Sequence, residues 1–175
     1  KKSINFNKIV CLKDNKIQYD VCFSYTPYHE HKLLSKIKST TVQLKYLNEI
    51  KSNGYKVIIS LHPKCDIKFY SNFFKDFDIR VGRTEDCIIE SKLVIAFYSS
   101  ILLWAVFSNK PFLVLDPFDF NYNFLEEMIE KKNIIKNKEH LLLKLKMNLN
   151  SKTDFQEHSN KFLGFNINNY NQILN

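Results

Sequence analysis

Short apolar runs alternate with longer amphipathic stretches along most of the chain. Three of these runs are apolar at nearly every position: VCF, VIISL and LVIAF. Such runs are typical of strands whose two faces are both covered by helices. The strands predicted from the pattern are residues 19–25, 56–61, 78–81, 93–97 and 111–115. Because helical stretches separate them, we predict an α/β domain, a Rossmann-like parallel sheet with helices on both faces.

The stretches between and after these strands have helical spacing. The longest, residues 32–53, ends before Gly54, a usual helix stop, and carries six apolar residues on one stripe: Leu33, Leu34, Ile37, Leu44, Leu47 and Ile50. Further helices are predicted at residues 67–75, 85–91, 100–108, 122–132, 139–149 and 153–162. The segment 101–107 is apolar on every side, so it must be buried against the sheet or a neighbouring domain.

Length and ends bound the organisation of the chain. At 175 residues it is long enough for one domain with a sizeable core and too short for two ordinary ones. We expect a single nucleotide-binding domain over residues 1–175, with its core in 18–135 and extra C-terminal helices in 136–175. The first residues have neither an initiator Met nor an apolar leader. We therefore expect a larger protein, with an N-terminal partner domain that is absent from this chain.

Apolar runs and cysteines bear on location. The sequence has no run of eighteen or more apolar residues, so we expect no transmembrane span. The sequence has four cysteines: Cys11, Cys22, Cys65 and Cys87. They are scattered without a C-x-x-C pair, and three of the four stand in or beside apolar runs, where a thiol packs as a small hydrophobe. We predict neither a zinc site nor a disulfide framework. The expected location is the cytoplasm, with peripheral contact to the inner face of the membrane as an extension.

The net charge favours an anionic partner. Lys and Arg number 26 against 18 Asp and Glu, which gives +8 and suits a nucleotide, a nucleic acid or an acidic membrane surface. An AT-rich coding genome would also produce this Lys-rich composition, so the charge does not choose among them. Six lysines suggest a non-enzymatic alternative, a basic nucleic-acid-binding or membrane-docking module: Lys131, Lys132, Lys136, Lys138, Lys144 and Lys146. A solvated helix face is the more common explanation of such lysines.

The first candidate for chemistry is His62-Pro63, directly after VIISL. Proline cannot continue a central ladder, so the strand ends and leaves the His62 imidazole at the carboxyl edge of the sheet. Ligands bind at this edge in open α/β sheets. A histidine there can donate a ring N–H to a phosphate oxygen or act as an acid for a leaving phosphate. The alternative without a function is a histidine that caps a loop. The position of His62 at a strand end favours the phosphate contact over this alternative.

A second candidate is Tyr98-Ser99-Ser100, between LVIAF and the apolar helix. The hydroxyls of Ser99 and Ser100, with the backbone N–H groups at the helix start, can form a phosphate site with the helix dipole behind it. Capping without a ligand explains the serines equally well when this feature is taken alone.

Polar residues follow two further strands. Asp116 and Asp119 are candidates for contacts with a ribose or an acceptor sugar, with loop capping as the alternative. Thr26 and His29 are candidates for contacts with the acceptor or a phosphate, and a solvated loop is the alternative. His29 and His31 flank a glutamate but lie on opposite sides of a helix, so no metal site is expected.

A weaker candidate is the acidic start of the helix at 85–91. Glu85 or Asp86 can reach a nucleotide there, although acidic residues that open a helix are usually caps. The other candidates all fall at the ends of predicted parallel strands. Their convergence on one edge, rather than any single motif, predicts a nucleotide-binding site.

Residues 19–122 resemble the C-terminal domain of GT-B glycosyltransferases that use cytidine-linked donors. The resemblance lies in three segments: VIISLHP, TEDCIIESK and LVIAFYSSILLWAVFSNKPFLVLD. Bacterial sialyltransferases and Kdo transferases of this kind carry an HP motif and an S-S motif that bind the phosphate of a CMP-sugar. The CDP-glycerol glycerophosphotransferases of teichoic acid synthesis carry a similar order of motifs. Both comparisons assign His62, Ser99 and Ser100 to the donor phosphate, with Pro63 and Tyr98 beside them.

The resemblance implies a metal-independent transferase without a cofactor, in bacterial capsule or lipopolysaccharide synthesis, with His62 as the catalytic residue. Its partners would be a nucleotide-activated sugar or polyol and a glycan or lipid-linked acceptor, with no nucleic acid. The sialyltransferase base lies in an acidic D/E-D/E-G motif that this sequence lacks, so the chain would hold only the donor half. A second resemblance, to UDP-GlcNAc 2-epimerases, rests on YTPYHEHK. It ranks lower because Ser99-Ser100 lacks the paired glycines and the glutamate of that family's turn.

Overall fold

The chain forms a parallel sheet with α-helical connections. The structure is a computed structural model that describes residues 17–29, 32–97, 99–119 and 133–150. Within these residues the sheet has six strands in the order β3-β2-β1-β4-β5-β6, and all neighbouring strands are parallel. The strands are β1 (Tyr19–Ser24), β2 (Val57–Leu61), β3 (Asp78–Val81), β4 (Ser91–Phe97), β5 (Phe112–Leu115) and β6 (Ile134–Ile135). The predicted α/β fold is confirmed.

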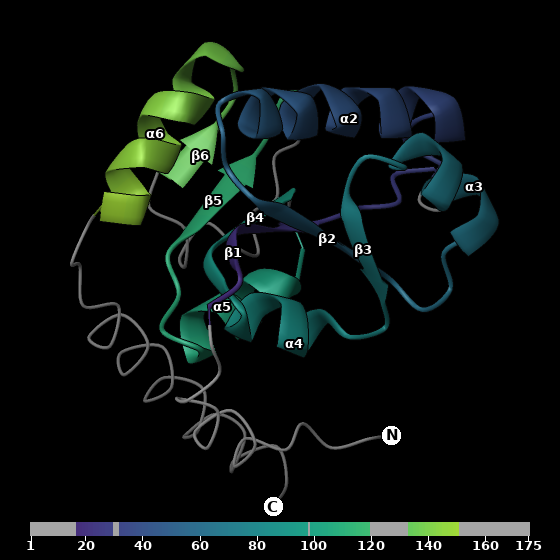
Figure 1. The fold of residues 1–175 in the computed structure, drawn as a ribbon. Helices are drawn as coiled ribbons and strands as arrows, with labels where there is room; N and C mark the ends of the chain where they lie inside the picture. The colour runs from purple at the N-terminus through teal and green to yellow at the C-terminus, as the bar shows by residue number, and fades with distance from the viewer. Residues whose placement is uncertain (1–16, 30–31, 98, 120–132, 151–175) are drawn as a thin grey trace, which may run out of the picture.

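Helices cover both faces of this sheet (Figure 1). On one face lie α2 (Lys36–Ser52), α3 (Ile67–Phe73) and α6 (Glu139–Asn150). On the other face lie α4 (Thr84–Ile89) and α5 (Ile101–Phe107). The helices on each face bury a separate hydrophobic core against the strands, as a doubly wound sheet requires.

Alternating side chains of each strand supply the two cores. Phe23 and Phe97 point to the α2 face, where their rings meet edge to face with centroids 6.2 Å apart. Cys22 on β1 points to the α4 face and hydrogen-bonds to Cys87 of α4. This bond, together with burial, raises the pKa of the Cys22 thiol. As expected, the described cysteines Cys22, Cys65 and Cys87 are buried free thiols.

The chain reverses its direction across the sheet beside β1. It moves from β1 through β2 to β3, then returns to β4 on the other side of β1. Crossover connections in parallel sheets are right-handed, so opposite directions of travel place α2 and α3 on one face and α4 and α5 on the other. The loops that leave β1 and β4 therefore diverge, and ligands of open α/β sheets bind at such a point.

The longest helix begins later than predicted. Ser35 has extended backbone, and its side chain accepts a hydrogen bond of 3.2 Å from the Lys38 N–H, so α2 begins at Lys36. Lys32 has a φ of 57°, which is incompatible with the interior of a helix. The predicted start at residue 32 is therefore wrong, and residues 32–34 form a turn.

The buried face of α2 also differs from the predicted apolar stripe. Leu33 and Ile37 were placed on that stripe, but their exposed fractions are 46% and 65%. Buried polar side chains take their place at the N-terminal half of the helix: Ser39, Thr40 and Gln43. They hydrogen-bond to the loop after β1 or within α2, which removes the cost of burying them.

Smaller differences concern the ends of other elements. Ser91, predicted as the last residue of a helix, opens β4, where it pairs with Tyr19 and donates its hydroxyl to the Cys87 carbonyl at 2.7 Å. The two residues of β6 were not predicted, because so short a strand has no periodicity. The predicted helices at 122–132 and 153–162 lie outside the described residues. Among the helices described, none combines the length and apolarity that a membrane-spanning segment needs.

Candidate functional site

A row of residues leaves the sheet at one level of its carboxyl edge. Ser24, Ser60, Arg80, Ala96, Val114 and Ile134 are register partners from strand to strand. Two positions further along, the chain has Thr26, His62, Gly82, Asp116 and Lys136. The sheet therefore brings together residues that are up to 110 positions apart in sequence (136 − 26). Three of the predicted site residues belong to this row: Thr26, His62 and Asp116.

Thr26 is held by a buried side chain of α2. Its backbone N–H donates to Gln43 Oε1 at 3.0 Å, and its carbonyl accepts from Gln43 Nε2 at 2.7 Å. The loop after β1 is thereby fixed through its backbone. Two polar atoms of this loop, Thr26 Oγ1 and His29 Nδ1, are buried and have no hydrogen-bond partner among the described residues. Unsatisfied buried polar groups are uncommon and costly, and a bound water or a ligand atom is a usual partner of such groups.

His62 is exposed after the end of β2. The backbone N–H of Lys64 donates to His62 Nδ1 at 3.2 Å, so this nitrogen is the acceptor of the neutral ring. The proton of the neutral imidazole then lies on Nε2, which is free to donate to a ligand. The His62 carbonyl accepts from the Cys65 N–H at 2.9 Å, and this turn precedes α3. His62 thus presents a hydrogen-bond donor at the carboxyl edge, as predicted from its position after VIISL.

Ser99 and Ser100 play different parts at the start of α5. Ser99 caps α5: its side chain accepts weakly from the Ile101 N–H at 3.4 Å, and its carbonyl accepts from the Leu102 N–H at 3.1 Å. The Leu103 N–H donates to the Ser100 carbonyl at 3.1 Å. These first N–H groups of the helix are therefore engaged within the chain. Ser100 is exposed and its side chain makes no capping bond, so its hydroxyl is the group of this pair that can reach a ligand.

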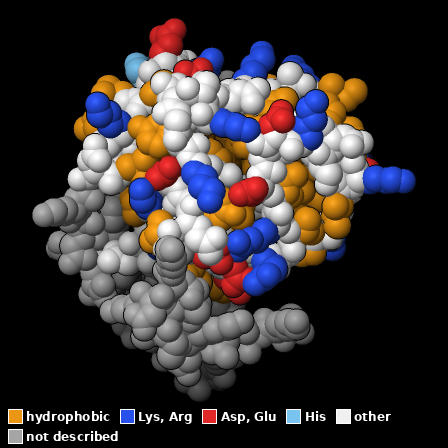
Figure 2. Space-filling model, viewed as in Figure 1, with side chains coloured by type: hydrophobic (Ala, Val, Ile, Leu, Met, Phe, Trp, Pro, Cys, Tyr) orange, Lys and Arg blue, Asp and Glu red, His pale blue; other side chains and the backbone are white. Residues whose placement is uncertain are grey.

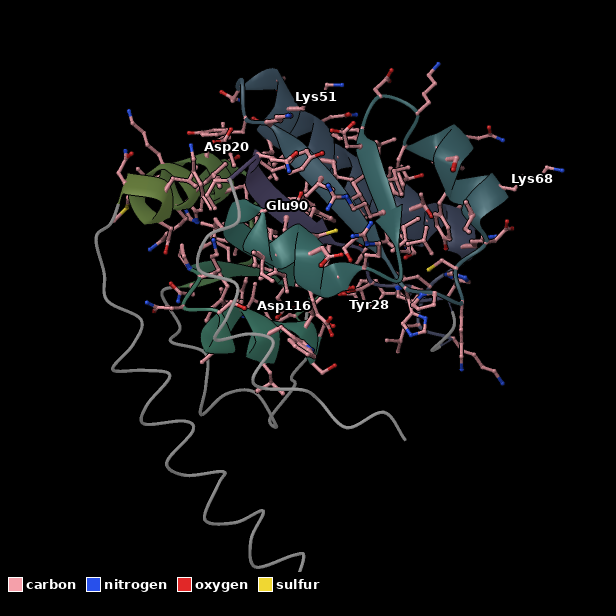
Figure 3. The ribbon with its side chains drawn as sticks, turned by 60° about the horizontal axis from the view of Figure 1, so that its bottom comes forward. Asp20, Tyr28, Lys51, Lys68, Glu90 and Asp116 are labelled. Carbon is pink, nitrogen blue, oxygen red and sulfur yellow. The ribbon has the colours of Figure 1, made fainter. Side chains whose placement is uncertain are left out.

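The two predicted aspartates after β5 have different surroundings. Asp116 is only 4% exposed, and its negative charge adds to the effect of burial in raising the pKa of Tyr46 in α2. Asp119 is exposed and forms an ion pair with Lys136, and the hydrogen bond to Asp119 raises the pKa of Lys136. Figure 3 shows Asp116 and Tyr28 low in the view, with Asp20, Lys51 and Glu90 above them, as expected for opposite edges of the sheet.

The geometry separates the two predicted phosphate contacts by one strand. His62 follows β2 and Ser100 follows β4, with β1 between them. Adjacent strands are about 4.8 Å apart, so the backbones of the two sites are about 10 Å apart along the edge. Both groups lie on the same edge of the sheet. They can contact different groups of one nucleotide-sized ligand, with the loop of Thr26 between them. Tyr98 lies outside the described residues.

No protein-family model matches the chain, and no curated protein matches its sequence. Among solved structures, the wall teichoic acid polymerase TagF aligns with a TM-score of 0.46 and 16% sequence identity. The alignment covers 91% of this chain but only 41% of TagF. A similarity of this degree carries no information on the activity of the chain. The α/β fold itself follows from the parallel sheet and its helices.

Sequence patterns missed the turn after β3. Gly82 has a φ of 67°, a conformation that favours glycine, and a Cβ atom at this position would lie 3.3 Å from Pro63 Cγ. The Thr84 hydroxyl is 2.8 Å from the hydroxyl of Ser60 on β2. The turn is therefore packed against the His62-Pro63 turn. A lone glycine before a helix was the only sequence signal.

The acidic candidates beside this turn are differently placed. Glu85 is exposed, and Asp86 forms a 2.6 Å ion pair with Arg83 Nε. Asp86 is therefore occupied by a side chain of its own turn. Nowhere in the described part of the chain do three or more His, Cys, Asp or Glu side chains group closely enough to hold a metal ion.

Proposed function

We propose that the chain is the donor-binding half of a glycosyltransferase or polyol-phosphate transferase. A nucleotide-activated donor would bind along the carboxyl edge of β2, β1 and β4. The observation that carries this proposal is the register: Thr26 and His62 leave adjacent strands at one level, and Ser100 follows β4 across the switch point. Polar groups from neighbouring parallel strands at such a point are the usual ligand contacts of open α/β sheets.

The proposed chemistry requires hydrogen-bond donors for a leaving phosphate. When the bond from the donor sugar or polyol phosphate to the nucleotide breaks, the phosphate oxygens of the leaving nucleotide gain negative charge. The Nε2–H of His62 would donate to these oxygens and lower the barrier. The hydroxyl of Ser100, on the other side of β1, would hold another group of the same ligand. A new bond then forms to an acceptor hydroxyl, whose proton leaves to a base.

A cytidine-linked donor and a role in bacterial surface polysaccharide synthesis are the finer part of the proposal. Their support is the order of three short segments in the sequence: HP at 62–63, S-S at 99–100 and KP at 110–111. His29 and Thr26 would contact a donor or acceptor hydroxyl, because their buried unpartnered atoms can accept and donate one hydrogen bond each. The reaction would need no metal and no cofactor, and it would take place in the cytoplasm.

A lipid-linked acceptor would bring the chain to a membrane surface. On α6, Leu143 and Met147 are 60% and 56% exposed and lie one turn apart. At 100° per residue, Lys144 and Lys146 lie on either side of this apolar pair. Apolar residues flanked by lysines suit the surface of an acidic membrane. We propose peripheral contact through this face of α6.

The mixture of charges argues against a nucleic-acid surface on the face seen in Figure 2. Basic and acidic side chains alternate there and form no continuous basic patch. Nucleic-acid-binding surfaces cluster Lys and Arg along a stripe or face. The net charge of +8 is thus not gathered into one site on that face.

Calorimetric titration with CMP, CDP, UDP, GDP and ADP tests the proposal. We expect selective binding of a cytidine nucleotide, and about tenfold weaker binding after His62→Asn or Ser100→Ala, since one hydrogen bond to a charged group contributes about 1.5 kcal/mol or more. His140→Asn on α6 and Ser71→Ala on α3 are matched controls, because both residues are exposed and outside the site.

The outcomes separate the alternatives. Equal affinity of wild type and both site variants would refute the assignment of His62 and Ser100. Selective binding of UDP would favour the epimerase interpretation. Binding of DNA or RNA that weakens steeply with salt, with no response to any nucleotide, would favour a basic binding module over a transferase.

A further inference from the structure

The turn after β3 carries a cation that no sequence motif assigned to the site. Arg83 follows Gly82 at the carboxyl edge, and its side chain is 66% exposed. Its Nε donates to Asp86 Oδ2 at 2.6 Å. No acceptor within the described residues contacts its terminal Nη groups. Asp86 therefore orients the guanidinium while the outer side of the fork stays available.

Three interactions hold this turn against the turn that carries His62. The Gly82 N–H donates to the Leu61 carbonyl at 3.0 Å. The hydroxyls of Ser60 and Thr84 are 2.8 Å apart. Gly82 packs on Pro63 so closely that no Cβ fits there without displacement. Gly82 and Pro63 are in contact, and Arg83 follows Gly82 while His62 precedes Pro63.

The register fixes the separation of the two turns at the backbone. Leu61 pairs with Val81, so His62 and Gly82 occupy neighbouring positions, about 4.8 Å apart, at the ends of β2 and β3. From backbones at this spacing, the long side chain of Arg83 and the imidazole of His62 can reach the same tetrahedral anion. Arg is suited to this, because its planar fork matches two phosphate oxygens at once.

We propose that Arg83 binds a phosphoryl group together with His62, and that Asp86 is its positioning residue. This inference rests on the proposed function, because it names a further contact for the donor phosphate. It extends the site to β3, on the side away from Ser100. Lys64 belongs to the turn that begins at His62 and adds an exposed positive charge to that turn.

Titration with inorganic pyrophosphate and with CDP tests the role of Arg83. For Arg83→Gln we expect affinity for both ligands to fall tenfold or more, and for Asp86→Asn a smaller loss. Lys75→Gln is the control: it removes one exposed positive charge before β3 begins, at the opposite edge of the sheet. A double variant with His62→Asn should lose less than the product of the two single losses, because both side chains would hold one anion.

Each failure has a distinct signature. Unchanged affinity in Arg83→Gln, or a loss no larger than in Lys75→Gln, would overturn the inference while CDP binding by wild type still supported the proposed function. If wild type binds pyrophosphate through Arg83 but binds no nucleotide, the anion site is supported and the proposed transferase function is overturned. Wild type that binds neither ligand would overturn both. The circular dichroism spectrum of Arg83→Gln should match that of wild type, because Arg83 is exposed and its substitution should not disturb folding.

Discussion

Two glycines provide a matched test of whether the turn after β3 positions His62. Gly82 and Gly54 both have positive φ, at 67° and 86°. A Cβ atom at Gly82 would lie 3.3 Å from Pro63 Cγ, whereas a Cβ atom at Gly54 would meet nothing within 4 Å. Alanine at either position strains the backbone. Only alanine at Gly82 also pushes on the turn that carries His62.

The expected magnitude follows from these two effects. An alanine in the left-handed region costs about 1–2 kcal/mol. For a chain of this size, that loss lowers the melting temperature by about 2–8 °C. Both variants should show it. The contact of 3.3 Å requires Pro63 to move by a few tenths of an ångström, and His62 is the next residue. We therefore expect weaker nucleotide binding, by about threefold or more, in Gly82→Ala alone.

Thermal unfolding and calorimetric titration of the two variants give the answer. The reasoning holds if both melt earlier and only Gly82→Ala loses affinity for the nucleotide that wild type binds. It is refuted if Gly82→Ala melts earlier but binds the nucleotide with unchanged affinity, because the packing on Pro63 would then not position His62. An equal loss of affinity in Gly54→Ala would also refute it, since Gly54 lies before β2 begins, at the opposite edge of the sheet from His62.

Two further predictions concern the sheet and α6. Burial raises the pKa of Asp20, but hydrogen bonds from the Lys92 side chain and from the Lys56 N–H outweigh burial and lower this pKa overall. The Asp20 carboxylate therefore stabilises the fold above about pH 3.9, and this stabilisation declines as the pH falls through the pKa of the folded state. Asp20→Asn should lower the free energy of unfolding in urea by about 1 kcal/mol at pH 7 and by less at pH 2; equal losses would contradict this. Leu143→Ser with Met147→Ser should weaken sedimentation with phosphatidylserine vesicles at least tenfold, without changing nucleotide affinity.

The sequence was a good guide wherever both faces of a strand are buried. VCF, VIISL and LVIAF are apolar at nearly every position because each of these strands lies under helices on two sides, and β1, β2 and β4 contain them. The same logic places His62 at a strand end, because Pro63 cannot continue the ladder. The level at which the strands end relative to one another is a property of the register. No local pattern encodes it.

The buried face of α2 shows why other parts were not predictable. A stripe of apolar residues predicts the buried side only when the helix packs on an apolar surface. Near its N-terminus α2 packs on the loop after β1, whose backbone needs hydrogen-bond partners, so Gln43 is buried and Ile37 is exposed. Polar burial of this kind depends on a tertiary contact. It therefore overrides the apolar periodicity of the helix.

The residues that shape the carboxyl edge differ from the residues proposed to bind the ligand there. The path of the β1 loop is set by backbone bonds to Gln43, and the turn after β3 is set by the Ser60–Thr84 and Gly82–Leu61 bonds. Three side chains proposed to meet the ligand are exposed and hold none of these bonds: His62, Arg83 and Ser100. Substitutions there should affect ligand binding far more than stability. An edge built this way can change its ligand while the sheet beneath it stays the same.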